Sequence, residues 1–287
     1  MKRPRSSPTL SPTIDSDPII THDSIMWGGL NITENARPIG PDSYYIPNFC
    51  ETYFEILPHT IFNMFMGMIN NWHTEEMRGN KIPRQMFYAA KPVPEHPDQA
   101  FRYGYTGWDN ATMLQLQDMS MIPPVEAIVN KLNEMCTFEG RSININHCIG
   151  TKYEAINDRI SEHQDDPKDI RDNTAIWVMS FGDVREMRIV RDTGRTKSSE
   201  KWEVVETIVM EPGSMFILGP QTNSKFYHTI VKVKSEGAIE REIRADGTPM
   251  FGPRISLVLR EIKTSISREK SLKRAKEIVK DRANRKK

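Results

Sequence analysis

Residues 151–170 read TKYEAINDRISEHQDDPKDI and contain a His-x-Asp step formed by His163 and Asp165. Residues two apart on an extended strand point to the same side. The imidazole of His163 and the carboxylate of Asp165 can therefore reach one metal ion from a single strand. A second histidine from elsewhere would complete a two-His-one-carboxylate set, which leaves coordination positions open for oxygen and a co-substrate. The alternative is a surface turn in an acidic run.

A second polar pattern lies at Arg254, Ser256 and Arg260, in the stretch RISLVLR. Their even spacing places these three residues on one side of a strand, and the intervening apolar residues then face the core. Burying two arginine side chains on one face of an otherwise apolar strand costs free energy unless their charges pair with anions. The pattern therefore favours an anion-binding face over an ordinary surface strand.

Together with His228, in SKFYHTIVKV, these motifs resemble the AlkB family of Fe(II)- and 2-oxoglutarate-dependent dioxygenases, most closely its nucleic-acid-dealkylating branch. The family pattern is Asn-x-Tyr, ten residues, His-x-Asp, a distant His, and Arg-x-Asn-x-x-x-Arg. Tyr153 stands ten residues before His163, as this pattern requires. The resemblance covers roughly residues 44–262.

The resemblance implies that His163, Asp165 and His228 are the catalytic metal ligands and hold Fe(II). Such a set, with open positions, suits non-haem Fe(II) rather than a closed zinc site. The implied reaction is the oxidative demethylation of alkylated bases in DNA or RNA, a direct-reversal repair. It converts 2-oxoglutarate and O2 to succinate and CO2, and the hydroxylated methyl group leaves as formaldehyde. The target base has to leave the stack to react.

By the same resemblance, Arg254 and Tyr153 hold the far carboxylate of 2-oxoglutarate, because a planar guanidinium offers two parallel hydrogen bonds. Arg260 supports the end of the co-substrate next to the iron. Two positions depart from the family pattern, since Thr151 and Ser256 stand where the family has asparagine. Both keep a hydroxyl, so we expect co-substrate binding with altered hydrogen bonding.

The stretch FRYGYTG at residues 101–107 resembles the family's flap over the substrate nucleotide. The family geometry places the base between Tyr105 and the ring of His163, with Thr106 nearby. An ordinary aromatic hairpin is the alternative. Further groups suited to base stacking and phosphate contact are Arg84, Arg102 and Tyr88.

Acidic residues of the family are replaced at two substrate-facing positions. Pro167 stands two positions after the metal aspartate, where the family has an acid that reads the amino group of the base. Asp166 and Asp169 are the candidates to substitute for it. Ala90 stands in place of the acidic flap residue.

The apolar pattern predicts helices at 54–72 and 123–136. From residue 141 the pattern switches to strands, predicted at 142–148, 175–181, 187–190, 202–210, 214–218, 227–233 and 255–262. Many short strands after two helices indicate an α+β, mainly β domain with its N-terminal helices packed on one face. This suits the double-stranded β-helix, or jelly roll, of the family.

The 287 residues suffice for one domain plus tails. We expect a disordered segment at 1–30, the dioxygenase domain at 40–262 and a basic tail at 263–287. The tail holds eleven Lys or Arg against three acidic residues. Two interpretations of this charge are open. The tail either binds the phosphate backbone of a nucleic acid or forms a solvated helix that packs on the domain.

Three widely spaced cysteines form no disulfide framework, which indicates a reducing compartment. No apolar run approaches the length of a membrane span. We therefore expect an intracellular monomer that acts on nucleic acid and not at a membrane, and the KRPR run at residues 2–5 favours the nucleus. The alternatives are an oxygenase that hydroxylates a protein or small molecule, and a nucleic-acid-binding module whose oxygenase site has decayed.

Overall fold

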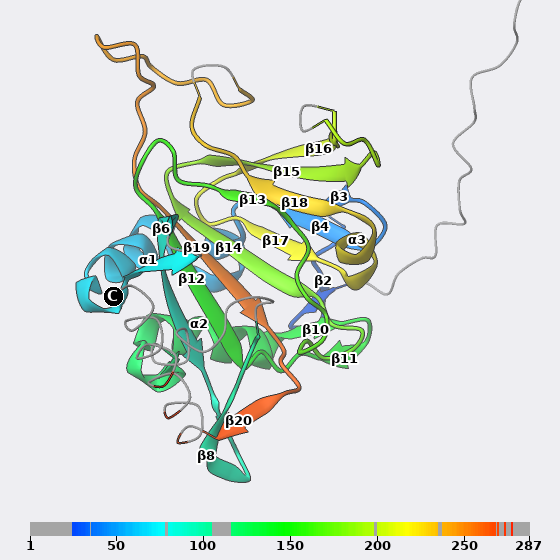
Figure 1. The fold of residues 1–287 in the computed structure, drawn as a ribbon. Helices are drawn as coiled ribbons and strands as arrows, with labels where there is room; N and C mark the ends of the chain where they lie inside the picture. The colour runs from blue at the N-terminus through cyan, green and yellow to red at the C-terminus, as the bar shows by residue number, and fades with distance from the viewer. Residues whose placement is uncertain are drawn as a thin grey trace, which may run out of the picture.

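Two facing sheets form the body of the protein in the computed structural model (Figure 1). The structure describes residues 25–34, 36–77, 80–104, 116–197, 200–234 and 237–267, and the single residues 269, 273 and 277. The predicted base-contacting residues Tyr105 and Thr106 lie outside the described residues. So do residues 1–24 and most of the basic tail.

The major sheet follows the order β3-β4-β17-β14-β19-β12-β6-β5, and β9 pairs in parallel with β6. Its strands are β3 (Arg37–Ile39), β4 (Ser43–Ile46), β5 (His73–Met77), β6 (Asn80–Ala90), β9 (Leu116–Asp118), β12 (His147–Tyr153), β14 (Ile176–Gly182), β17 (Met215–Leu218) and β19 (Arg254–Arg260).

The minor sheet follows the order β13-β18-β15-β16 and faces the major sheet. Its strands are β13 (Ile160–His163), β15 (Arg185–Asp192), β16 (Trp202–Met210) and β18 (Tyr227–Ile230). Two small sheets complete the structure, in the orders β11-β10-β1-β2 and β20-β8-β7. Their strands are β1 (Met26–Trp27), β2 (Leu30–Asn31), β10 (Cys136–Phe138), β11 (Arg141–Ser142), β7 (Pro92–Val93), β8 (His96–Phe101) and β20 (Ser265–Ser267).

The major sheet is buried on both faces, because its strands alternate between two apolar clusters. On β19, Ile255, Leu257 and Leu259 belong to the cluster on the helix side, and the sequence prediction that they face the core is confirmed. Val258 packs on the cluster between the two sheets. The arginines at the two ends of β19 therefore point between the sheets. This topology is the predicted jelly roll, and it encloses the polar face of β19.

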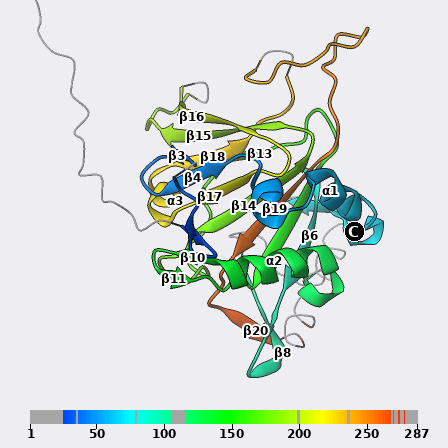
Figure 2. The same ribbon diagram turned by 180° about the vertical axis from the view of Figure 1, so that it is seen from behind.

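The helices are α1 (Pro58–Met66), α2 (Pro123–Met135) and α3 (Pro220–Lys225), with short turns at Cys50–Phe54, Ile69–Asn71 and Met119–Met121. Seen from behind, α1 and α2 lie across the major sheet (Figure 2). Phe65 of α1 contacts Phe87 and Phe181, with ring centroids 6.2 and 6.1 Å apart. The helix predicted over 54–72 is shorter than expected, because the chain turns at Gly67.

The strand predicted at 142–148 is displaced, since β12 begins only at His147. The amide side chain of Asn133, on α2, explains the shift. Its Nδ2 donates to the carbonyl of Ile145 at 2.9 Å, and its Oδ1 accepts from the N–H of Ile145 at 2.7 Å. One side chain therefore replaces the ladder hydrogen bonds of this residue, and the regular strand starts two residues later.

The domain was predicted to start at residue 40, but it begins earlier in the chain. The segment predicted as disordered covers residues 1–30, and its last part is ordered from Ile25. Ile25 and Trp27 are 1% and 5% exposed and belong to the helix-side core. β1 pairs with β10, which lies more than a hundred residues further along the chain. Buried apolar side chains and long-range pairing offset the ordering entropy of this segment.

The three cysteines, Cys50, Cys136 and Cys148, are buried free thiols, as expected. Burial raises the pKa of Cys50 to about 12, so its thiol stays protonated. Among the described helices, none has the length and apolar character needed to cross a membrane.

Candidate active site

The two sheets enclose a cavity of about 60 Å³ that is lined by both polar patterns of the sequence. A water needs roughly 10–15 Å³ on the same measure. His163, Asp165 and His228 enter the cavity from the minor-sheet side, while Arg254 and Arg260 enter from β19. The fold therefore brings the predicted metal and anion-binding groups together in one space.

The two histidines are held side by side by strand pairing, because His163 on β13 lies opposite His228 on β18. Their ring centroids are 4.2 Å apart. The Nδ1 atom of His163 lies 2.9 Å from the carbonyl of Ser161 and must donate to it, since a carbonyl only accepts. The other ring nitrogen of His163 is then free to bind a metal, the arrangement common among metal-ligating histidines.

Asp165 is the third member of this group, and its two oxygens have different neighbours. Oδ1 accepts from Arg260 at 2.6 Å and from the Tyr103 hydroxyl at 3.1 Å. Oδ2 faces His228 Nε2 at 3.9 Å. Asn223 fixes the backbone, since its side chain bonds both the N–H and the carbonyl of Asp165. One oxygen is thus anchored, and the other points toward the histidines.

The protonation states of the three groups are those of metal ligands. Burial lowers the pKa of His228 to about 3, and burial also lowers the pKa of His163. Burial alone would raise the pKa of Asp165, but Arg260 and the two histidines outweigh it and lower that pKa to about 2. Near neutral pH the site holds two neutral imidazoles and one carboxylate, the forms that bind a metal.

Among the described residues, no group of three His, Cys, Asp or Glu side chains is close enough together to hold a metal ion as it stands. This applies also to His163, Asp165 and His228, which we call the triad. Neighbouring ligands about 2.1 Å from an ion lie about 3.0 Å apart at a right angle. His228 Nε2 and Asp165 Oδ2 are 3.9 Å apart. These atoms would have to approach by roughly 1 Å to hold an ion, which side-chain rotation can supply. The donor set fits Fe(II) on these terms.

Arg254 is fully buried, and its charge is only partly satisfied. Its Nε donates to the Ser180 hydroxyl at 3.0 Å, and its guanidinium lies over the ring of Tyr153 at 5.2 Å. The two terminal nitrogens have no hydrogen-bond partner among the described residues. Burial lowers the pKa of Arg254 to about 10, which leaves the group charged near neutral pH. A buried guanidinium with two such terminal nitrogens can bind a carboxylate through two parallel hydrogen bonds.

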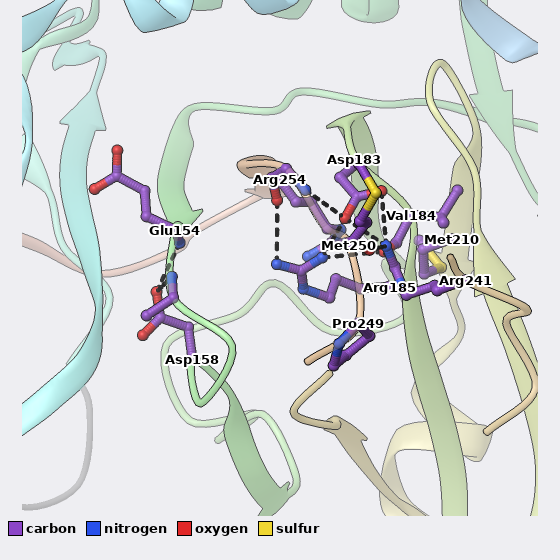
Figure 3. A network of polar contacts seen from close by, with 12 residues as sticks. Glu154, Asp158, Asp183, Val184, Arg185, Met210, Arg241, Pro249, Met250 and Arg254 are labelled. Atoms are coloured by element: carbon purple, nitrogen blue, oxygen red, sulfur yellow. Dashed lines mark hydrogen bonds and ion pairs between the residues drawn. The ribbon is translucent and has the colours of Figure 1, made fainter. Parts of the chain in front are cut away.

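A network of polar contacts fixes the backbone that leads into Arg254 (Figure 3). Asp183 accepts from Arg185 at 2.7 Å and from Arg241 at 2.8 Å, and it also accepts from the N–H of Gly252 at 3.0 Å. Arg241 further donates to the carbonyl of Val184. These contacts hold the turn between β14 and β15 against the chain that precedes Arg254. They lock the start of β19 and thereby the position of Arg254.

The two departures from the family pattern lie opposite each other. Thr151 and Ser256 form a cross-strand pair of β12 and β19, and Tyr153 and Arg254 form the next inward-facing pair. All four line the cavity. The two hydroxyls thus face the same space as the guanidinium, where they can bind a polar ligand.

The predicted substrate residues are placed less uniformly. Arg84 lines the cavity and donates to the carbonyl of Arg159 at 2.9 Å. Arg102 is half-buried, and its backbone is bonded to Thr264. Tyr88 is only 4% exposed and belongs to the apolar cluster between the sheets, so its contact with a base stays a prediction.

The two acidic candidates, Asp166 and Asp169, lie in the loop after Asp165 and accept hydrogen bonds from backbone N–H groups. Asp166 accepts from the N–H of Lys168 at 3.0 Å and closes a turn. Asp169 accepts from the N–H of Gly104 and from Thr264. Neither lines the cavity, so the structure leaves the amino-group contact of the family without a replacement among these two residues.

Sequence reasoning missed Tyr103 and Asn223, which both contact Asp165. Tyr103 lies in the aromatic stretch at 101–107 and could have been chosen from it, whereas Asn223 carries no motif. Asp42 holds Asn223 in place by accepting from two N–H groups at the start of α3. His147 is 2% exposed and pairs with Arg260 across β12 and β19.

Residues 43–260 match the 2OG-Fe(II) oxygenase superfamily, and the chain belongs to this family. It is an AlkB-like dioxygenase, an oxidoreductase that uses Fe(II), 2-oxoglutarate and O2. The residues that line its cavity fit this family, since His163, Asp165 and His228 could hold the metal and Arg254 could hold a carboxylate. The metal when bound supplies the activation of O2.

Similar curated proteins include the DNA oxidative demethylase ALKBH2 of Mus musculus and of Homo sapiens. Each is 24% identical over 182 residues, or 62% of this chain. The matches cover 66% of the mouse protein and 60% of the human one, so the chain spans less than two thirds of the length of these relatives. The solved structure of OsALKBH1 aligns at a TM-score of 0.45 and 15% identity, over 79% of this chain and 99% of that one.

Proposed function

We propose that this protein oxidatively demethylates alkylated bases in DNA, with Fe(II) held by His163, Asp165 and His228. The observation that carries the proposal is the shared cavity, which is lined both by the triad and by Arg254, whose two terminal nitrogens have no hydrogen-bond partner among the described residues. The keto-acid end of 2-oxoglutarate binds at the metal and its far carboxylate binds Arg254. Thr151 and Ser256 contribute hydroxyls beside it.

Nucleic acid as the substrate is supported by the two relatives named as DNA oxidative demethylases and by the residues near the cavity. The guanidinium of Arg84 reaches the cavity, and its Nε has no hydrogen-bond partner among the described residues. A guanidinium at that position suits a phosphate or a base edge. The enclosed space is small, so the flipped base reacts at its mouth.

Turnover on a panel of oligonucleotides, each with one N-methylated base, tests this function. Formaldehyde and succinate should form together on at least one methylated strand, and the unmethylated strand should give succinate only at the background rate. Succinate formation that no oligonucleotide accelerates would exclude nucleic acid and point to a protein or small-molecule substrate.

Tyr105→Ala should lower the specificity constant for methylated oligonucleotide by roughly 5- to 150-fold. A stacked base is worth about 1–3 kcal/mol by alanine substitution, and about 1.4 kcal/mol is a factor of ten. The background conversion of 2-oxoglutarate to succinate should stay near that of the parent, because it needs no base. Tyr105→Phe is the matched control and should be mild. A parallel fall in both conversions would assign Tyr105 to the core instead.

Removal of the basic tail should flatten the salt dependence of nucleic-acid binding. Each Lys or Arg that neutralises a phosphate adds roughly 0.9 to the log–log salt slope on duplex DNA. The cut belongs after Ser267, because a cut after Ile262 would also remove β20, which pairs with β8. Equal slopes for the full and shortened chains would show that the tail does not contact phosphate.

A further inference from the structure

Three segments that are distant in sequence meet at the carboxylate of Asp169. These are the stem of the flap at residues 99–104, the strand β20 with the residues just before it, and the loop that follows Asp165. Figure 1 shows β8 and β20 together, projecting from the end of the major sheet. The structure therefore ties the stem of the flap, up to Gly104, to the loop after Asp165.

The contacts at this point are short and involve both oxygens of Asp169. Oδ2 accepts from the N–H of Gly104 at 2.7 Å, and Oδ1 lies 2.9 Å from the Thr264 hydroxyl. The same hydroxyl lies 2.9 Å from the carbonyl of Arg102, and its one hydrogen serves either acceptor. The N–H of Arg102 donates to the carbonyl of Thr264 at 3.1 Å. We call Asp169 and Thr264 the flap joint.

The flap joint fixes the residues on both sides of Tyr103. Arg102 is bonded through its N–H and its carbonyl, and Gly104 is bonded through its N–H. Tyr103 itself is 8% exposed, and its hydroxyl donates to Asp165 Oδ1 at 3.1 Å. Its ring also lies under the guanidinium of Arg260, 4.4 Å from centroid to carbon.

The approach of Gly104 to Asp169 leaves little room for a side chain. A Cβ added at Gly104 would lie 3.0 Å from Asp169 Oδ2. The joint is therefore closely packed as well as hydrogen-bonded, and the position of Tyr103 relative to Asp165 is set from both sides.

We propose that Asp169 is a positioning residue for the iron site, acting through Tyr103 on the orientation of the Asp165 carboxylate. Tyr103 and Arg260 together hold Oδ1, which leaves Oδ2 turned toward the histidines. The flap joint thereby couples the segment that leads to the substrate flap with the metal carboxylate. This inference rests on the proposed metal ligands, and it is independent of the identity of the substrate.

Mn(II) binding by the metal-free full-length protein, measured by the EPR signal of the free ion, tests the proposal without nucleic acid. Tyr103→Phe keeps the ring and removes only the hydroxyl, and loss of such an outer partner typically costs about 10- to 100-fold in metal affinity. Asp169→Asn replaces one acceptor oxygen by a donor, so it should weaken Mn(II) binding in the same direction. Thr264→Val should do the same by a smaller factor, and Thr264→Ser, which keeps the hydroxyl, is its matched control.

The decisive measurement is the double variant. If Asp169 acts through Tyr103, then Asp169→Asn should change the Mn(II) affinity by less than about twofold once Tyr103→Phe is present, whereas independent sites add. Two outcomes overturn the proposal. One is parental Mn(II) affinity in Asp169→Asn, and the other is a full additive loss in the double variant, which marks a general effect on folding. Because no oligonucleotide is present, a failed demethylation assay would count against the substrate and not against the flap joint.

Discussion

His228→Ala is expected to reduce succinate formation to the level of the metal-free protein and to abolish stoichiometric Mn(II) binding. His228 faces Asp165 in the cavity, beside the imidazole of His163. Only His163 and Asp165 of the proposed ligands would remain. The metal site of this type needs three protein ligands on one face of the ion, with the remaining coordination positions open. The side chain is 14% exposed, so its removal should leave the fold intact, which circular dichroism can check.

Asp165→Ala is a poorer test of the same idea. Arg260 is 2% exposed and pairs with Asp165, and the loss of one partner of a buried ion pair costs about 3–5 kcal/mol. A dead Asp165 variant could then reflect unfolding rather than a lost ligand.

His147→Ala is the matched control for His228→Ala. His147 is 2% exposed in the same domain, and burial lowers its pKa to about 3. It does not line the cavity and should keep stoichiometric Mn(II) binding. Near-parental turnover by His228→Ala, or loss of metal by His147→Ala alone, would contradict the assignment of the ligands.

Arg254→Lys is expected to raise the KM for 2-oxoglutarate by roughly 10- to 100-fold, with a smaller change in kcat. Hydrogen bonds to charged groups contribute about 1.5–3 kcal/mol, and the two terminal nitrogens of Arg254 have no partner within the described part of the chain. Lysine is a point charge that cannot form the paired planar contact, and burial lowers the pKa of a lysine further toward neutrality. The far carboxylate would lose both the geometry and part of the charge of its partner.

A chemical control separates this role from a general defect. The compound 2-oxopentanoate keeps the keto-acid end of the co-substrate and lacks the far carboxylate. The parent protein and Arg254→Lys should use it equally poorly, since the missing group is the one that Arg254 binds. An unchanged KM for 2-oxoglutarate in the variant would remove Arg254 from the co-substrate site. An equal loss with both compounds would assign the residue to the packing of β19.

The sequence by itself determined the parts of this site whose spacing is local. The even spacing of Arg254, Ser256 and Arg260 follows the twofold period of a strand, and the three side chains line one cavity. His163 and Asp165 line the same cavity, although Asp165 lies two residues beyond the end of β13 and so is not placed by strand alternation. The mainly β class and the burial of the apolar residues of β19 follow from the alternation of the strands.

Sequence periodicity could not determine which strand a residue joins, because a side-chain amide can replace ladder bonds, as Asn133 does ahead of β12. It also could not show that Tyr88 is buried between the sheets, because burial depends on how the two sheets pack together.

Only the tertiary structure brought Tyr103 to Asp165 across 62 residues and Thr264 to Asp169 across 95 residues. Such contacts depend on how the sheets close and how β20 pairs with β8, and no local pattern encodes them. The metal carboxylate is therefore recognisable from its own neighbours in sequence, whereas the groups that orient it are set by chain closure.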